Sequence, residues 1–147
     1  MITLDDLIRE TNAFFSLYWN SKHGNPPEWS TKPWEFDGTI EGNTKRGCYA
    51  LFSDAEVIYI GVGLGKSQDR YHGSGLGDRL KNYWQVDNSN SGKMYKPRNK
   101  WENILTGIRT IGFPEECFEL AAALEVYLIK KLNPPENTQH KTTAGKG

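Results

Sequence analysis

The chain has 147 residues, enough for one domain with its own core, and its 18 basic and 18 acidic side chains cancel to a net charge of zero. It contains no apolar run near the roughly 18 residues of a membrane-spanning helix. The acidic start MITLDDLIRE does not fit a signal peptide. We therefore expect no membrane association.

Charge is distributed unevenly along the chain. Residues 1–44 carry 3 basic and 7 acidic side chains, a balance of −4, whereas residues 45–147 carry 15 and 11, a balance of +4. Between Tyr59 and Lys100 there are 8 basic and 3 acidic side chains. Clustered Lys and Arg side chains contact phosphates, so this part predicts a nucleic-acid surface. A scattered, solvated basic face is the alternative.

The first predicted element is a helix that Thr3 caps and that runs to about residue 19. Asp6 near its start favours the positive end of the helix dipole. Its apolar side chains recur at helical spacing: Leu4, Leu7, Ile8, Phe14, Phe15 and Tyr18. The sequence GNPP then ends this helix.

Residues 20–45 contain three prolines and several aromatic side chains without periodicity. A structureless segment this long is uncommon in a compact domain. We therefore expect Trp29, Trp34 and Phe36 to anchor it to the core. Stacking of Trp29 or Trp34 on bases is the alternative, which the acidic character of the segment opposes because it would repel phosphate.

Residues 47–61 predict a β-hairpin. The apolar runs CYALF and VIYI flank the polar break SDAE, and aromatic and β-branched residues are typical of paired strands. The pairing register decides whether the phenols of Tyr49 and Tyr59 emerge on one face. From the pattern alone, the two tyrosines are either core aromatics or functional residues.

A glycine-rich insert follows at residues 62–78. Its GKS sequence is similar to the end of a phosphate-binding P-loop, but that motif requires glycine at position 60, where Ile60 stands. We predict a flexible basic loop, because glycine lets the backbone approach a phosphate closely. Lys66 and Arg70 are its phosphate-binding candidates.

An amphipathic helix is predicted over residues 76–85, with Arg79 and, one turn later, Tyr83. Residues 87–92 (DNSNSG) predict a loop. A basic run follows, made of Lys93, Lys96, Arg98 and Lys100 with Tyr95 among them. A helical turn around Trp101 leads to a third strand at residues 106–113.

The last predicted helix spans residues 115–132, with Pro114 near its first turn. We expect its buried stripe to consist of Phe118, Ala121, Ala122, Val126 and Ile129, with Glu125 among them. A carboxylate in an apolar stripe is costly unless it is paired, protonated or metal-bound. A salt bridge to an arginine is the structural alternative. Beyond Pro134 and Pro135, Asn137 is either a turn residue or a group that orients tyrosine or backbone.

Cys48 and Cys117 lie within apolar patterns and predict buried thiols in a reducing compartment, which indicates a cytosolic protein. Two cysteines with three scattered histidines do not make a zinc site.

Five elements occur in a fixed order: Gly47-Cys48-Tyr49, Tyr59-Ile60-Gly61, Arg79, Glu125 and Asn137. In this joint order the chain resembles the GIY-YIG nuclease family over about residues 46–139, although either tripeptide alone would be a weak signal. The resemblance implies an α+β (sandwich-like) fold, a small three-stranded antiparallel sheet flanked by helices. The expected organisation is an N-terminal helical extension (1–45), a nuclease domain (46–140) and a flexible tail (141–147).

The resemblance implies a metal-dependent DNA endonuclease that leaves 5′-phosphate and 3′-hydroxyl ends. Glu125 would be the sole carboxylate ligand of Mg²⁺ (or Mn²⁺), and Arg79 would hold the scissile phosphate. Tyr49 is the favoured base and Tyr59 the alternative. Tyr83 stands where family members often carry His or Tyr.

A free phenol has a pKa of about 10, so we expect Lys66 or Arg79 to lower the pKa of the catalytic tyrosine. Cys48 replaces the usual Ile of the first motif, and Val62 stands where many relatives carry Lys, so Lys66 is the candidate for that role. The predicted DNA track lies away from the acidic residues 1–44 and comprises Lys66, Arg70, Lys93, Lys96, Arg98 and Lys100. A non-catalytic nucleic-acid-binding or interaction module on the same fold is the alternative function.

Overall fold

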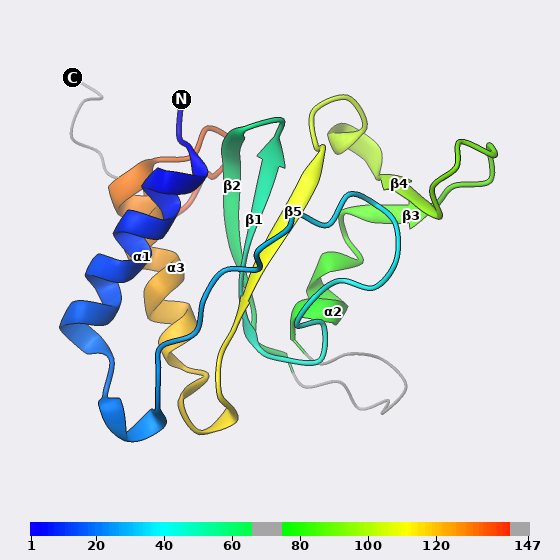
Figure 1. Ribbon diagram of the computed structural model, residues 1–147. Helices are drawn as coiled ribbons and strands as arrows, with labels where there is room; N and C mark the ends of the chain where they lie inside the picture. Colours follow the sequence, from blue (N-terminus) through cyan, green and yellow to red (C-terminus); the bar gives the residue numbers. More distant parts are fainter. Residues whose placement is uncertain (66–74, 142–147) are drawn as a thin grey trace.

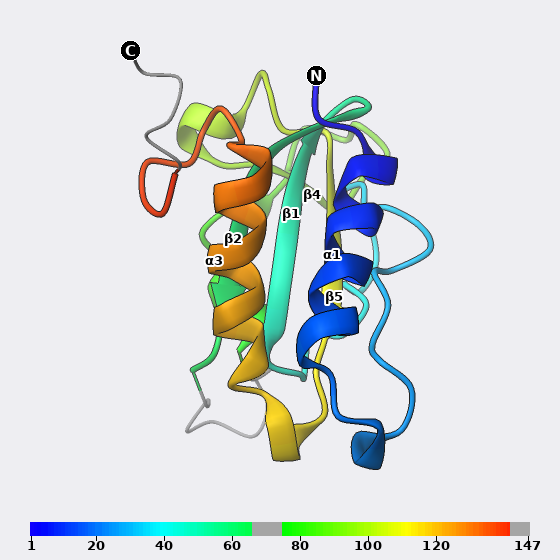
Figure 2. The same ribbon diagram turned by 90° about the vertical axis from the view of Figure 1, so that its left-hand side faces the viewer.

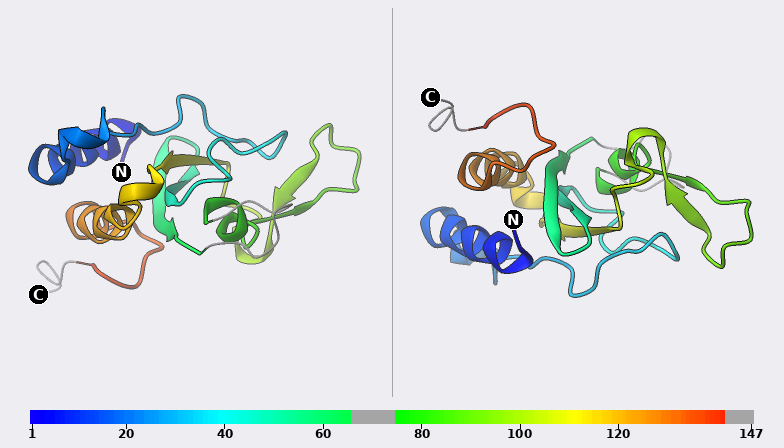
Figure 3. Two further views of the ribbon diagram at one scale, coloured as in Figure 1. Left: turned by 90° about the horizontal axis from the view of Figure 1, so that it is seen from below. Right: turned by 90° about the horizontal axis from the view of Figure 1, so that it is seen from above.

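The computed structural model describes residues 1–65 and 75–141. The fold is α+β: a three-stranded antiparallel sheet in the order β2–β1–β5 has α1 and α3 on one face and α2 on the other (Figures 1 and 3). The helices are α1 (Leu4–Tyr18), α2 (Leu76–Leu80) and α3 (Leu120–Leu132), with 3-10 turns η1 (Ser21–His23), η2 (Asn99–Trp101) and η3 (Glu115–Cys117). The strands are β1 (Gly47–Ser53), β2 (Glu56–Gly63), β3 (Trp84–Val86), β4 (Tyr95–Pro97) and β5 (Gly107–Gly112).

The expected hairpin is present as β1 and β2, and its register is now defined. Tyr49 pairs with Gly61 and Leu51 pairs with Tyr59. Because cross-strand partners share a face and side chains alternate along a strand, Tyr49 and Tyr59 emerge on the same face. That face points toward α2, and the opposite face of β1 points toward α1 and α3.

The predicted N-terminal helix is confirmed as α1. The Thr3 hydroxyl accepts a hydrogen bond from the Asp6 amide at 3.2 Å, and the Asp6 carboxylate accepts one from the Thr3 amide at 2.9 Å. This reciprocal capping box satisfies two amides that the first helical turn leaves free. Leu7, Phe14 and Phe15 are buried against α3 and the sheet, and α1 and α3 run side by side over it (Figure 2).

The aromatic residues of segment 20–45 are anchored in the core, as the sequence predicts. Trp29 is 7% exposed and its indole N–H donates to Thr11 Oγ1 at 2.9 Å. Trp34 is 8% exposed and forms an antiparallel bridge with Ile108 of β5. Neither ring has a free face for a base, so the base-stacking alternative is disfavoured.

Irregular segments cover both edges of the three-stranded sheet. Ser30 and Trp34 bond to β5 through the amides and carbonyls that point outward. On the other edge, Glu136 N donates to Ile58 O at 2.9 Å and Asn137 bonds to Ile60. A covered edge leaves no row of free backbone groups to pair with another chain.

The helix predicted over residues 76–85 is wrong in its second half. It ends at Leu80, and Trp84–Val86 instead forms β3, which pairs with Tyr95–Pro97. The residues Trp84 and Val86 favour a strand, and pairing with a distant segment overrides the helical spacing. Tyr83 therefore lies in the turn after α2, not on the same helix as Arg79.

The start and the buried stripe of the last helix also differ from the prediction. Residues 115–117 form a 3-10 turn after Pro114, and the α-helix begins at Leu120. The fully buried side chains of α3 are Ala121, Leu124, Leu128 and Ile129, whereas Phe118, Ala122 and Val126 are only half-buried. Phe118 lies under the Arg46 guanidinium, 4.0 Å from the ring centroid, and not against the sheet. Glu125 therefore borders the buried stripe.

Cys48 and Cys117 are buried free thiols, as expected. The Cys48 thiol donates to the Ala121 carbonyl at 3.1 Å, which ties β1 to α3. Within the described ranges, no helix combines the length and apolar character needed to cross a membrane.

Candidate active site

Three tyrosines meet on the α2 side of the sheet and are called the tyrosine cluster below: Tyr49, Tyr59 and Tyr83. The hydroxyls of Tyr49 and Tyr83 are 2.6 Å apart. The ring centroids of Tyr49 and Tyr59 are 6.2 Å apart, and those of Tyr59 and Tyr83 also 6.2 Å. Tyr49 is completely buried, Tyr83 is 6% exposed and Tyr59 is half-buried. Tyr59 is therefore the phenol most open to solvent.

Close contacts explain why both tripeptides contain a glycine. The Tyr49 ring lies across Gly61 of the neighbouring strand, so a Cβ at position 61 would overlap the ring and its hydroxyl. A Cβ at Gly47 would overlap the carbonyl of Ile111. Only glycine lets the two strands and the Tyr49 ring approach this closely.

Burial dominates the acidity of the tyrosine cluster. It raises the pKa of Tyr49 to about 12, although hydrogen bonds with Tyr83 and Arg79 act in the opposite direction. Burial also raises the pKa of Tyr83 above its ordinary value. The expectation that a nearby cation lowers the pKa of Tyr49 is therefore wrong for this structure: the interaction with Arg79 is present, but the desolvation of the buried phenol outweighs it.

Arg79 is held in place by the tyrosine cluster. It lies on α2, and its hydrogen bond with Tyr49 is the main reason that its pKa is raised. A guanidinium fixed on one side keeps its remaining donors available in a planar fork.

Glu125 approaches the same region from the other face of the sheet. Its pKa is raised by burial, while the charges of His140 and Arg79 lower it. The charge of Arg79 on α2 thus reaches Glu125 on α3, although the two helices cover opposite faces of the sheet. Among the described residues, no ion pair or hydrogen bond to the Glu125 carboxylate is found, so the salt-bridge alternative lacks support there.

Asn137 binds the backbone of β2. Its side-chain oxygen accepts from Ile60 N and its amide nitrogen donates to Ile60 O, both at 2.9 Å. Asn137 is 6% exposed, and its side chain makes the two backbone hydrogen bonds that a neighbouring strand would make at this edge, next to Tyr59. Of the roles left open by the sequence, orienting the backbone is the one observed.

An Asn137→Ala variant should be destabilised, because it leaves the amide and carbonyl of Ile60 buried and unpaired. Each such group costs about 1–3 kcal/mol, so we expect the free energy of unfolding to fall by roughly 2–6 kcal/mol. Urea denaturation measures this. Thr138→Ala, at an exposed neighbouring position, is the control. Equal stability of the two variants would contradict the edge-binding role.

The predicted DNA track is only partly described. Lys66 and Arg70 lie outside the described residues. Lys93, Lys96, Arg98 and Lys100 are all exposed, in β4 and its flanks. Lys100 lies near Glu136, at 3.8 Å, and over the Trp101 ring, at 4.6 Å.

The expectation that acidic residues 1–44 lie away from this track is wrong for part of the segment. The Asp37 carboxylate accepts a hydrogen bond from Met94 N at 3.2 Å, and the Phe36 carbonyl accepts one from Tyr95 N at 3.0 Å. Burial of Trp34 and Phe36 on the α2 side of the sheet draws this stretch next to β4.

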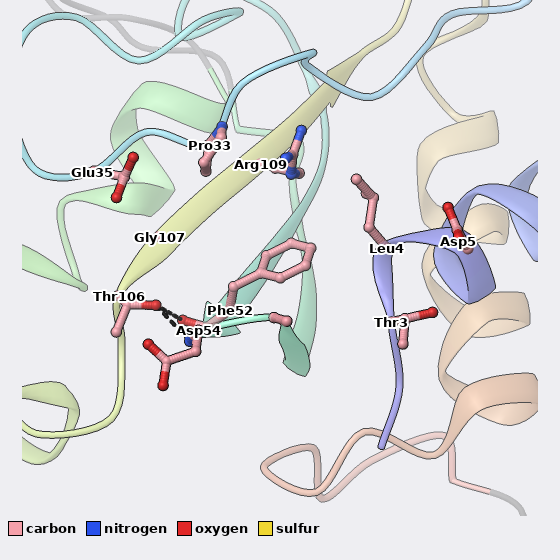
Figure 4. Close-up of a pocket in the computed structure, with 11 residues that line it drawn as sticks. Thr3, Leu4, Asp5, Pro33, Glu35, Phe52, Asp54, Thr106, Gly107 and Arg109 are labelled. Atoms are coloured by element: carbon pink, nitrogen blue, oxygen red, sulfur yellow. Dashed lines mark hydrogen bonds between the residues drawn. The ribbon is translucent and has the colours of Figure 1, made fainter.

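A cavity of about 450 Å³ lies at the end of the sheet where β1 turns into β2 (Figure 4). Asp5, Glu35 and Asp54 line it, and Arg109 is its one cationic side chain. The Arg109 guanidinium already donates to Ser30 O at 2.7 Å. An excess of carboxylates repels phosphate, and none of the predicted site residues lines this cavity, so it is not the candidate active site.

Two residues of the site were not singled out from the sequence. Trp101 packs its ring against Tyr59 and Tyr83, with ring centroids 6.0 and 5.6 Å apart. Its position directly after the basic run that ends at Lys100 is the sequence feature that indicates a place near the site. His140 acts on Glu125 electrostatically, and nothing in the local sequence indicates this. Comparison of the chain with protein-family models, curated proteins and solved structures finds no match.

Proposed function

We propose that this protein is a metal-dependent DNA endonuclease of the GIY-YIG type, which hydrolyses phosphodiester bonds to 5′-phosphate and 3′-hydroxyl ends. The observation that carries the proposal is the tyrosine cluster, which brings the tyrosines of both tripeptides together with Tyr83 beside Arg79. An arginine can bind a phosphate directly, whereas a carboxylate such as Glu125 would hold it through a bound metal ion.

Glu125 fits a Mg²⁺ or Mn²⁺ ligand. Its charge is partly desolvated and has no hydrogen-bonded or ion-paired partner among the described residues. No group of three or more potential ligands occurs within these residues, and a single carboxylate suits Mg²⁺, which retains waters and takes substrate phosphate oxygens. When bound, the ion would neutralise charge on the phosphate and on the leaving 3′ oxygen.

Arg79 binds the scissile phosphate in this proposal. Its guanidinium can offer two parallel N–H donors to phosphate oxygens, which a lysine cannot do. The hydrogen bond with Tyr49 fixes the orientation of that fork before DNA arrives. Preorganised donors of this kind stabilise charge that develops in the transition state.

Tyr49 links proton transfer to phosphate binding, because its hydroxyl contacts both Tyr83 and Arg79. With a pKa of about 12, it keeps its proton at neutral pH. The ionised fraction of Tyr49, which can act as a base, therefore rises about tenfold for each unit by which the pH increases toward that pKa.

A Tyr49→Phe variant should cleave DNA about 10²-fold more slowly or worse, with little change in stability, since Phe keeps the ring. The rate of the wild type should rise between pH 7 and pH 9, and this rise should be absent in the variant. Single-turnover cleavage over that pH range is the measurement, with Tyr59→Phe as the matched variant. Near-wild-type cleavage by Tyr49→Phe would move the base role to Tyr59 or to solvent.

A further inference from the structure

Strands β3 and β4 form a two-stranded ribbon, residues 84–97, that projects from the body of the protein (Figures 1 and 3). None of the five motif elements lies in the ribbon. In its register Trp84 pairs with Pro97, Gln85 with Lys96 and Val86 with Tyr95. The polar and the aromatic side chains are therefore sorted onto different faces.

The aromatic face of the ribbon is occupied. The ring centroids of Trp84 and Tyr95 are 4.7 Å apart, and Tyr95 lies 5.8 Å from the Trp34 ring of the core. These rings are not free to stack on unpaired bases. The ribbon therefore lacks the exposed aromatic platform on which proteins bind single strands.

The tip of the ribbon presents amides. The Asp87 carboxylate accepts hydrogen bonds from Ser89 N at 2.9 Å and from the hydroxyls of Ser89 and Ser91 at 2.6 Å each. These bonds lower the pKa of Asp87 to about 2 and occupy both serine hydroxyls. Asn88 and Asn90 alternate with the serines and are exposed. Asparagine side chains can bond both to a base donor and to a base acceptor.

The charge of the ribbon is complementary to phosphate. Lys93, Lys96 and Arg98 are exposed, and Asp87 is the one acidic residue between positions 84 and 98. The Asp87 carboxylate is hydrogen-bonded to Ser89 and Ser91 of the tip and stays ionised at neutral pH. Phosphates along the ribbon would therefore meet three cations against the carboxylate of Asp87 at the tip and that of Asp37, which bonds to Met94 N.

We propose that the ribbon enters the major groove of duplex DNA, with Lys93, Lys96 and Arg98 on phosphates and Asn88 and Asn90 toward base edges. The groove is about 12 Å wide and about 8.5 Å deep, and it admits a two-stranded ribbon. Strand β3 has three residues and spans roughly 10 Å, about the depth of the groove, and the tip residues 87–94 lie beyond it. This inference rests on the proposed function and names the form of its substrate.

The base of the ribbon joins the candidate active site directly. Tyr83 of the tyrosine cluster immediately precedes β3, and its carbonyl accepts a hydrogen bond from Arg98 N at 3.0 Å. Seating the ribbon in a groove thus sets the position of the adjacent backbone relative to Arg79. Duplex RNA is excluded as an equal partner, because its major groove is too narrow and deep for side chains to read.

The binding test uses fluorescence anisotropy in EDTA, which stops metal-dependent cleavage, with duplex DNA, single-stranded DNA and duplex RNA of equal length. The wild type should bind duplex DNA most tightly. A Lys93→Ala/Lys96→Ala variant should bind about tenfold more weakly, and its slope of log affinity against log salt should shrink by about 1.8. Lys22→Ala/Lys32→Ala removes equal charge from exposed positions outside the ribbon and should bind as wild type. Melting temperatures are measured on the same samples.

Two further measurements probe the groove itself. Methylation of guanine N7, which lies in the major groove, should weaken binding by the wild type. An Asn88→Ala/Asn90→Gly variant, in which glycine keeps the left-handed backbone of Asn90 (φ 59°), should bind duplex DNA more weakly, because the contacts of both side chains to base edges are lost.

The ribbon assignment is overturned if the Lys93→Ala/Lys96→Ala variant binds duplex DNA as tightly as the wild type does. It is also overturned if the wild type binds single-stranded DNA or duplex RNA more tightly than duplex DNA. Indifference to N7 methylation would overturn it as well. The proposed function is tested separately. If the protein binds duplex DNA through the ribbon but never cleaves it, the ribbon assignment stands and the proposed nuclease activity is wrong.

Discussion

A Glu125→Gln variant is expected to bind DNA like the wild type and to cleave it at least 10²- to 10³-fold more slowly, the scale seen when one charge-stabilising group is removed. Glutamine keeps the length and helix propensity of the side chain but offers a metal ion only a neutral amide oxygen. Arg79 and the ribbon are untouched, so binding should survive.

The stability of this variant should hold or rise at neutral pH. Burial raises the pKa of Glu125, so the fold disfavours its charged form, and that penalty is present wherever the side chain is ionised, above its folded pKa. Glutamine removes the penalty. Melting temperature, DNA affinity and cleavage rate are measured on one preparation, with Glu119→Gln at an exposed position just before α3 as control. A Glu125→Gln protein that melts earlier yet still cuts DNA would favour a structural salt bridge instead.

A Gly61→Ala substitution should destabilise the hairpin and disturb the tyrosine cluster. The new Cβ would overlap the ring and hydroxyl of Tyr49, which is completely buried and has no space to retreat. Overpacking of this kind typically costs about 1–3 kcal/mol. The displaced phenol should also release Arg79, so cleavage should fall further than the loss of folded protein accounts for.

Gly65→Ala is the matched control, because a Cβ at that glycine meets nothing within 4 Å among the residues that the structure describes. Denaturant unfolding and single-turnover cleavage on both variants test the packing of the tyrosine cluster. Equal stability and activity of the two alanine variants would show that the Tyr49 ring does not depend on the glycine of the second tripeptide.

The parts of the fold with strong local signals were predictable from the sequence. The capping box at Thr3 and the apolar spacing of α1 define that helix, and the two aromatic runs define the hairpin. The ribbon was not predictable in the same way. Leu76, Leu80 and Trp84 fit a helical spacing, and only pairing with the distant residues 95–97 makes Trp84 part of a strand.

The candidate site was predictable as a set of residues but not as an arrangement. The order of the motifs selects Tyr49, Arg79 and Glu125, whereas the grouping of Tyr49 with Tyr59 and Tyr83 depends on the register of β1 and β2 and on the turn after α2. The direction of the Tyr49 pKa shift was not predictable either, because it is set by residues packed around the ring from distant parts of the chain.

The most direct test of the proposed nuclease activity is incubation of purified protein with supercoiled plasmid in Mg²⁺ and, in parallel, in EDTA. We predict nicked and linear products only with the metal, and the nicks should be resealed by DNA ligase without prior end repair, since 5′-phosphate and 3′-hydroxyl ends are substrates for ligation. Intact plasmid in Mg²⁺ and in Mn²⁺ with folded protein, or cleavage that persists in EDTA, would contradict a metal-dependent endonuclease.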